Sequence, residues 1–199
     1  MNLETIRNFE NKVASRFNDG LIRAPIHLSS NNENELINIF MSIRPQDWVF
    51  CSWRSHIQCL LKGVDQDKLL ISIMEGKSIA LCFPENKIYS SAIVGGSAPW
   101  AVGVALSIKR RGGSERVFCF IGDMTSETGI LQTCITYALN HELPLTFVVE
   151  DNNTSVMTDT RKIWNSDLLR YELQNFSNLI SYKYKSHWPH AGAGQRVQF

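Results

Sequence analysis

Residues 116–151 read RVFCFIGDMTSETGILQTCITYALNHELPLTFVVED, and this stretch decides the fold class. Its first part, Arg116–Ile121, is a continuous apolar run of the kind found in a strand buried on both faces. Apolar residues recur at helical spacing over Thr125–Asn140, and Leu145–Glu150 is a second strand-like run after the breaker Pro144. Strand, helix and strand in this order form a βαβ unit, so the two strands are predicted to be parallel. We therefore expect an α/β fold, in which a mostly parallel sheet carries helices on both faces.

The segments on either side of this unit fit the same fold class. Apolar residues at helical spacing predict four further helices, and a short apolar run between the second and the third of them predicts one more strand. Turn-forming residues between these segments predict loops, with Pro84–Ser91 as one of the loop-rich stretches. The expected helices cover the first twenty residues up to Gly20, Asn32–Met41, Asp65–Glu75 and Pro99–Arg110, and the expected strand covers Val49–Trp53.

Composition narrows the class of protein. The chain has 199 residues with 20 Lys plus Arg against 19 Asp plus Glu, which suits a single domain over residues 1–199. Scattered basic residues and a near-zero net charge argue against nucleic acid or an anionic membrane as a partner. An odd number of cysteines, five, with no CxxC pair favours a reducing, cytoplasmic location. No apolar run approaches the roughly 20 residues that span a bilayer, so we expect a soluble protein.

Polar residues follow both strands of the βαβ unit. Ligands of such sheets bind beyond the carboxyl ends of the strands, where Gly122-Asp123 and Asp151-Asn152-Asn153 are predicted to lie side by side. The Asp123 carboxylate, the Asn152 side chain and the carbonyl of Thr154 are oxygen donors of the kind that Mg²⁺ prefers. Asp123 as a helix N-cap and Asn152-Asn153 as a simple turn is the structural alternative, which these residues alone leave open.

The combination of Gly122-Asp123 with Asn152 at a fixed spacing is more specific than either feature alone. Gly-Asp after a buried strand, then 28 intervening residues, then Asn152 resembles the thiamine diphosphate motif. Together with the matches below, the chain resembles the alpha subunit of the thiamine-dependent decarboxylating component of 2-oxo acid dehydrogenases, such as pyruvate and acetoin dehydrogenase. The resemblance covers roughly residues 22–160 and implies a thiamine diphosphate-binding fold with thiamine diphosphate and Mg²⁺ as cofactors.

The resemblance assigns roles to individual residues. Trp53 and Arg54 match a segment whose arginine contacts the diphosphate, and Ala92 and Val94 match a segment that meets the aminopyrimidine ring. Met124 stands where the family usually has a glycine, which leaves its backbone N–H as a donor but changes the loop. The implied metal ligands are Asp123, Asn152 and Thr154, and the implied cofactor-binding residues are Trp53, Arg54, Ala92, Val94, Gly122, Met124, Thr125 and Asn152.

Histidines are the natural candidates for proton transfer. His187 and His56 match family histidines, and His190 is an additional candidate; we predict these three as catalytic. Lys185 occupies a position where the family has another histidine, which argues for a changed substrate or step. Each histidine taken singly could instead be structural.

No glutamate here convincingly matches the one that contacts the cofactor's pyrimidine, which in the resembled family comes from a beta subunit. The resemblance therefore implies an alpha-type subunit, active with a beta-type partner in an α2β2 heterotetramer, that decarboxylates a pyruvate-like 2-oxo acid and transfers the acyl or aldehyde unit. Because the chain is short, a stand-alone acyloin-type ligase or transketolase-like subunit acting on a sugar or aldehyde is an alternative. A non-catalytic scaffold or regulatory relative is an alternative of another class.

Overall fold

The computed structural model describes residues 1–191 and 197–199. Its main sheet has the strand order β2-β3-β1-β4-β5-β8. Every pairing in it is parallel except the antiparallel edge pair of β2 and β3. The strands are β1 (Trp48–Cys51), β2 (Cys82–Phe83), β3 (Ile88–Ser90), β4 (Val117–Gly122), β5 (Leu145–Asp151) and β8 (Leu179–Lys183), and a separate hairpin is formed by β6 (Thr154–Ser155) and β7 (Thr158–Asp159).

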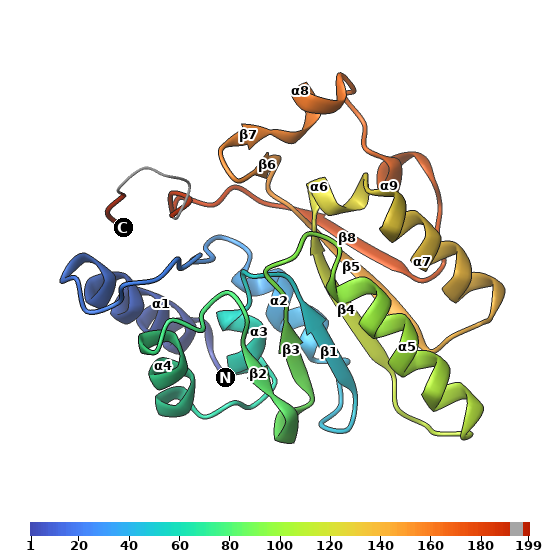
Figure 1. Cartoon of the computed structure of the whole chain (residues 1–199), viewed down its shortest axis with the longest axis horizontal. Coiled ribbons are helices and arrows are strands. Elements are labelled where there is room, and N and C mark those ends of the chain that lie inside the picture. The colour runs from blue at the N-terminus through green and yellow to red at the C-terminus, as the bar shows by residue number, and fades with distance from the viewer. Residues whose placement is uncertain (192–196) are drawn as a thin grey trace.

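Helices cover both faces of the sheet (Figure 1). The helices α1 to α4 pack on one face, and α5 and α7 pack on the other. They are α1 (Leu3–Asn18), α2 (Glu33–Phe40), α3 (His56–Leu61), α4 (Gln66–Met74), α5 (Ser97–Arg110), α6 (Asp123–Ser126), α7 (Gly129–Asn140), α8 (Thr160–Trp164) and α9 (Arg170–Leu173), with a 3-10 turn at Pro84–Asn86. The predicted α/β class with a mostly parallel sheet is confirmed.

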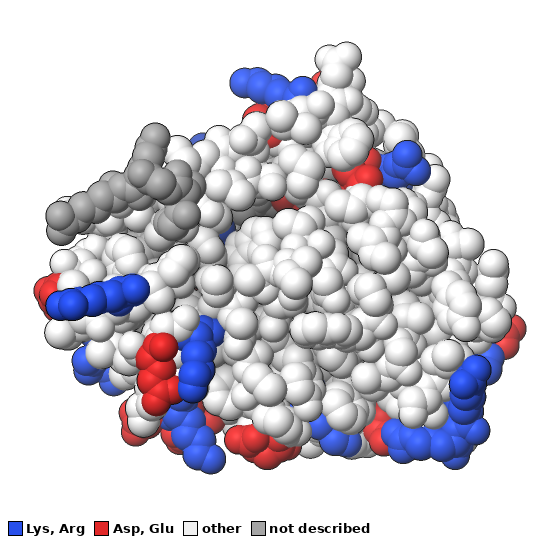
Figure 2. Space-filling view, viewed as in Figure 1, with Lys and Arg blue, Asp and Glu red and all other residues white. Residues whose placement is uncertain are grey.

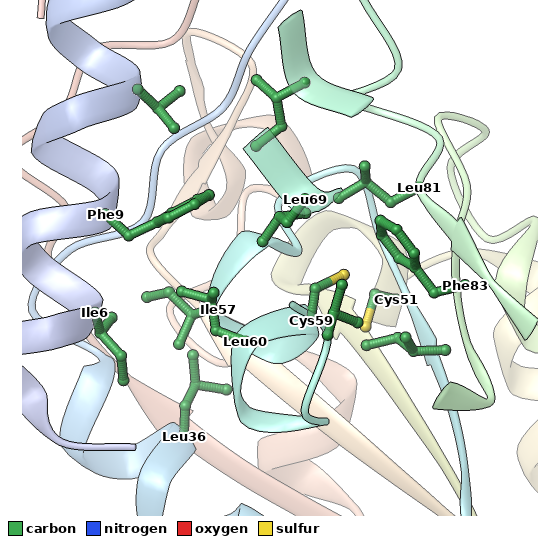
Figure 3. Close-up of a cluster of buried hydrophobic side chains, with 14 of the residues drawn as sticks. Ile6, Phe9, Leu36, Cys51, Ile57, Cys59, Leu60, Leu69, Leu81 and Phe83 are labelled. Carbon is green, nitrogen blue, oxygen red and sulfur yellow. The ribbon is translucent and has the colours of Figure 1, made fainter. Parts of the chain in front are cut away.

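Strand β4 shows why the predicted apolar run is buried on both faces. Successive side chains of a strand point to opposite faces, so Phe118 and Phe120 join the core under α1 to α4, whereas Cys119 and Ile121 join the core under α5 and α7. In the first of these cores, side chains from α1, α2, α3, α4 and β1 point toward one another (Figure 3). Burying apolar area on both faces contributes about 25 cal/mol per Å² and holds the strand ends in register.

Helix α5 packs closely because its inner face is small. Ala98, Ala101, Ala105 and Ile108 recur at helical spacing and are all buried against the sheet. Alanines on that face let the helix axis approach the strands, and the start of α5 is thereby fixed beside the carboxyl end of β1. This placement brings the residues before α5 to the same edge as the ends of β4 and β5.

Two sequence predictions need correction. The single helix expected over Thr125–Asn140 is two helices, because Thr128 ends α6 and caps α7: its Oγ1 accepts from Leu131 N–H at 3.4 Å and donates to the Thr125 carbonyl at 2.7 Å. The stretch Pro84–Ser91, expected as a loop, contains β3, whose Ile88 is buried beside β1. Within the described ranges, 1–191 and 197–199, no helix has the length and hydropathy of a membrane span.

Candidate functional site

An open cleft lies at the carboxyl ends of β1, β4 and β5. Parallel pairing sets Gly122 opposite Glu150, so the chain leaves the sheet at neighbouring points after both strands. The cleft is visible as a hollow in the upper part of the face drawn in Figure 2. Most of the predicted site residues line it: Trp53, Arg54, Val94, Gly122, Asp123, Met124, Thr125, Asn152, Thr154 and His190.

Asp123 is the most unusual of these residues. Its side chain is only 2% exposed, and its Oδ2 has no hydrogen-bond partner among the residues that the structure describes. Burial, with a smaller contribution from the charge of Asp151, raises the pKa of Asp123 to about 6. An unpaired buried carboxylate is costly to hold, so its position at the cleft indicates a site for a positive charge.

The loop after β5 carries the other predicted metal ligands. Asn152 Oδ1 accepts the Thr154 N–H at 3.0 Å, which forms a tight turn. Thr154 then begins β6, which pairs with β7 and contacts α6, the helix that starts at Asp123. The loop is thus folded back over the end of β4, next to the unpaired carboxylate.

These donors fit a hard divalent cation. They comprise one carboxylate, one amide oxygen and one backbone carbonyl, and Mg²⁺ is commonly held by one or two carboxylates together with phosphate oxygens. Backbone donors for a phosphate are expected at Met124 and Thr125, which line the same cleft. In the described part of the chain, no three or more His, Cys, Asp or Glu side chains gather into a possible metal site.

Arg54 and His190 also line the cleft. The guanidinium of Arg54 donates to the carbonyl of Leu28, which holds the side chain at the cleft. The His27 and His190 rings stack with centroids 4.3 Å apart. Burial, followed by the charge of Arg54, lowers the pKa of His27 to about 3 and also lowers the pKa of His190. Both imidazoles are therefore neutral at pH 7, and His190 reaches the cleft in that form.

Val94 reaches the cleft through a glycine turn. Gly95 has φ +73°, and a Cβ at this position would lie 2.7 Å from Ile130 Cγ2 on α7. Only glycine satisfies both the backbone angle and this close approach. Ala92 lies two residues earlier in the same segment and lines a neighbouring pocket with His27, Trp53 and His190.

Two of the predicted catalytic histidines lie elsewhere. His56 is 1% exposed in the interior, with Nε2 2.8 Å from Ser78 Oγ and Nδ1 3.2 Å from Glu10 Oε1. His187 packs against Trp188 and lines a separate groove beside α1. The structure brings His190 to the cleft and does not bring His56 or His187 there.

Glu150 and Tyr184 also line the cleft but are absent from the predicted set. Glu150 accepts hydrogen bonds from Gln58 Nε2 at 3.0 Å and from the Tyr182 hydroxyl at 2.6 Å, and burial raises its pKa to about 7. The signal that could have identified it is a carboxylate at the end of an apolar run that is buried on both faces, because charge is rarely buried without a partner or a function.

Comparison with known proteins gives one family. The model of the family described as "Dehydrogenase E1 component" matches residues 1–170. The alpha subunit of acetoin:2,6-dichlorophenolindophenol oxidoreductase from Bacillus subtilis is 28% identical over 158 residues, which cover 74% of this chain and 47% of that protein. The human testis-specific mitochondrial pyruvate dehydrogenase E1 component subunit alpha is 26% identical over 166 residues, covering 79% of this chain and 43% of that protein.

The chain spans about half the length of the curated relatives it matches. Among solved structures, a candidate thiamin diphosphate-dependent enzyme from Mycobacterium smegmatis matches with a TM-score of 0.45 and 19% identity, over 65% of this chain and 23% of that one. That score is too low for a detailed comparison of the two folds.

Proposed function

Because the chain belongs to the dehydrogenase E1 component family, we propose that it is an alpha-type subunit holding the diphosphate half of a thiamine diphosphate site. The whole enzyme would decarboxylate a pyruvate-like 2-oxo acid and transfer the remaining acyl or aldehyde unit. The observation that carries the proposal is the buried, unpaired Oδ2 of Asp123 at the cleft that Asn152 and Thr154 also line. We propose residues 1–199 as a single thiamine diphosphate-binding domain.

Different residues of the cleft would bind Mg²⁺ and the diphosphate. Asp123, the Asn152 side chain and the Thr154 carbonyl would hold Mg²⁺, which would neutralise part of the diphosphate charge. Arg54 and the N–H groups of Met124 and Thr125 would take the remaining phosphate charge.

Other residues of the cleft would contact the ring end of the cofactor or take part in proton transfer. Trp53, Ala92 and Val94 would contact the aminopyrimidine ring, while neutral His190 would hold or pass a proton at the mouth of the cleft. When bound, thiamine diphosphate supplies the electron sink that decarboxylation of a 2-oxo acid requires. His56 and His187 act on the reaction only if partner binding changes their surroundings.

A partner would complete the site. The face over α5 and α7 is largely free of charge in Figure 2, with Lys, Arg, Asp and Glu toward its edges. Large apolar side chains are exposed on these helices and beside the cleft, among them Ile93 at 71% and Trp100 at 51%. An apolar area bordering a binding site is typical of a protein interface. We infer that a beta-type subunit covers it and supplies the pyrimidine-contacting glutamate in an α2β2 assembly.

The test compares the purified chain with the chain coexpressed with a beta-type subunit. We expect the isolated chain to lack activity, and the complex to release CO₂ from a 2-oxo acid only with thiamine diphosphate and Mg²⁺. Because a ligand bound only by the native state raises stability, cofactor plus Mg²⁺ should also raise the melting temperature of the complex. Full activity of the isolated chain would contradict the partner requirement.

The same assay separates the two alternatives. A complex that ligates the two-carbon unit to an aldehyde or sugar, with no need for a lipoyl acceptor, would identify an acyloin-type ligase or transketolase-like enzyme. A complex whose melting temperature does not respond to thiamine diphosphate and Mg²⁺ would identify a scaffold, a role for which the replacement of the family glycine by Met124 is the specific argument.

A further inference from the structure

Arg161 of α8 folds back onto the loop that carries Asn152 and Thr154. A guanidinium has five N–H donors in a fixed planar arrangement, and the structure uses all five. The acceptors are the Asp167 carbonyl for Nε at 3.0 Å, Asp151 Oδ1 at 3.3 Å and Asn153 Oδ1 at 2.9 Å for Nη1, and Asp151 Oδ2 and Glu172 Oε2, both at 2.8 Å, for Nη2.

Two of these acceptors flank Asn152 in the chain. Asp151 is 2% exposed, and its carboxylate also accepts the Asn153 N–H at 2.8 Å and the Tyr171 hydroxyl at 2.5 Å. Asn153 adopts the left-handed conformation, φ 56°, and its Nδ2 donates to Asp159 Oδ2 at 2.9 Å. Arg161 thus ties the residue before Asn152 to the residue after it, and closes the turn from outside.

We propose that Arg161 is a positioning residue for the cation site: by clamping Asp151 and Asn153 it sets where the Asn152 amide and the Thr154 carbonyl point. This inference rests on the proposed function and goes beyond it, since Arg161 does not line the cleft and would not touch the cation. Its charge also keeps Asp151 paired, which leaves Asp123 as the carboxylate open to the cation.

Lysine cannot replace this arrangement. An ammonium group has the same charge but a single donor centre, whereas the clamp depends on a planar fork that reaches Asp151 and Asn153 together. Groups beyond the metal's own ligands that orient those ligands typically change metal affinity by about 10- to 100-fold when altered. Arg161→Lys is therefore expected to weaken cation binding while keeping the charge.

If Arg161 only stabilised the fold, loss of any of its ion pairs would have similar effects. A variant of Glu172 distinguishes this role from the positioning role. Glu172 Oε2 accepts from the guanidinium at Nη2, and the Glu172 carboxylate also pairs with Lys183 and accepts the Leu169 N–H. Glu172→Gln should lower the melting temperature without moving the loop. Arg170→Lys is the matched control, because Arg170 is 55% exposed and its nearest acidic partner, Glu127, lies 3.9 Å away.

The experiment uses the full chain together with any partner it requires. Hydrogen exchange of the Asn153 and Thr154 amides, which are bonded to Asp151 Oδ1 and Asn152 Oδ1, reports on the loop without cofactor. The Kd of Mn²⁺ in the presence of thiamine diphosphate, measured from the spin-resonance signal of free Mn²⁺, reports on the site. Arg161→Lys should speed exchange of both amides and raise this Kd about tenfold or more. Glu172→Gln and Arg170→Lys should leave both within twofold of the parent.

Several outcomes would overturn the inference. One is unchanged exchange and unchanged Kd in folded Arg161→Lys, and another is an equal rise in Kd for Glu172→Gln. If Arg161→Lys does not fold, Asn153→Gly keeps the left-handed turn but removes the side-chain bonds to Arg161 and Asp159, and it must then raise the Kd. A parent complex that binds no Mn²⁺ with thiamine diphosphate would overturn the proposed function, whereas unchanged exchange would overturn the clamp alone.

Discussion

Asp123 and Asp151 stand at the ends of the neighbouring parallel strands β4 and β5, are equally buried, and have opposite surroundings. Asp151 accepts from Arg161, Tyr171 and the Asn153 N–H, and although burial alone would raise its pKa, these hydrogen bonds hold that pKa below the ordinary range. Asp123 keeps one oxygen unpaired, and burial raises its pKa to about 6.

The different surroundings of the two aspartates indicate different roles, one structural and one functional. A buried carboxylate is normally neutralised by a cation or by several hydrogen bonds, and the chain provides both for Asp151. Among the described residues, Asp123 has no cationic partner and its Oδ2 has no hydrogen bond, although Arg161 binds the carboxylate of the adjacent strand. Positions where a fold leaves a buried charge uncompensated are candidates for a missing ligand, so Asp151 organises the edge of the sheet and Asp123 serves the proposed cation.

The largest expected effect is on binding. Asp123→Asn removes the full negative charge from the proposed cation site, and we expect the Kd of thiamine diphosphate with Mg²⁺ to rise more than about 100-fold, beyond what changes outside the ligand set usually cost. Isothermal titration of the assembled protein measures it. Asp67→Asn, an exposed change on α4, is the control. Parent-like affinity in Asp123→Asn would remove Asp123 from the cation site.

The next effect is on stability, and it concerns the other aspartate. Asp151→Asn leaves the guanidinium of Arg161 without its main carboxylate. Breaking such a pair should lower the free energy of unfolding by about 3 kcal/mol, the low end for buried pairs because Arg161 is partly exposed. Because the folded pKa of Asp151 is depressed, its contribution is present above the ordinary aspartate pKa and is lost as the pH falls through the folded value. Urea titrations at neutral and acidic pH should show that the difference in unfolding free energy between the parent and Asp151→Asn becomes smaller as the pH falls.

In the protein without cofactor, Asp123→Asn should raise the free energy of unfolding, whereas Asp151→Asn lowers it. A folded pKa raised from 3.8 to about 6 means that the native state binds the proton more tightly, so ionisation destabilises the fold as the pH rises between these values. The shift sets an upper limit of about 3 kcal/mol, and with local relaxation we expect a gain of about 1–2 kcal/mol at pH 7. Urea unfolding should show this gain disappear near pH 4. A loss of stability at pH 7 would mean that Asp123 is already compensated.

Much of this edge of the sheet could be predicted from sequence. The strands β4 and β5 are long apolar runs, and parallel pairing then dictates that Asp123 and Asn152 meet. The edge strand β8 was not predicted, because none of its residues is fully buried and no apolar pattern marks it. The break between α6 and α7 was missed for a local reason, since one threonine hydroxyl outweighs a helical pattern that continues across it.

The contacts of Arg161 with the loop after β5 could not be predicted from such sequence patterns. Arg161 contacts residues eight to ten positions earlier in the chain and Glu172 eleven positions later, across turns whose geometry depends on left-handed Asn153 and Val156. The placement of His56 in the interior likewise follows from packing of α1 against α3, which brings Glu10 to its ring. Sequence motifs indicated which residue types belong together at the strand ends, but only the tertiary structure separates the histidine at the cleft from those outside it.

The smallest expected effect tests whether the residue beside Asp123 belongs to binding or to architecture. Met124 lines the cleft, and its sulfur accepts the Trp164 Nε1–H at 3.2 Å, so the side chain joins α6 to α8. Met124→Gly should cost about 1 kcal/mol or less of unfolding free energy, through the lost contact and the flexibility of glycine. The backbone N–H groups remain, so the affinity for thiamine diphosphate with Mg²⁺ should change less than about threefold, far below the effect at Asp123.

A change in that affinity of tenfold or more in Met124→Gly would place the side chain among the determinants of diphosphate binding. Met124→Leu is the matched variant, because it keeps the apolar volume and removes the sulfur acceptor. If Leu preserves both stability and affinity while Gly loses only stability, the methionine acts by packing α6 against α8. The uncompensated charge of Asp123 then remains the feature of this strand end that binding requires.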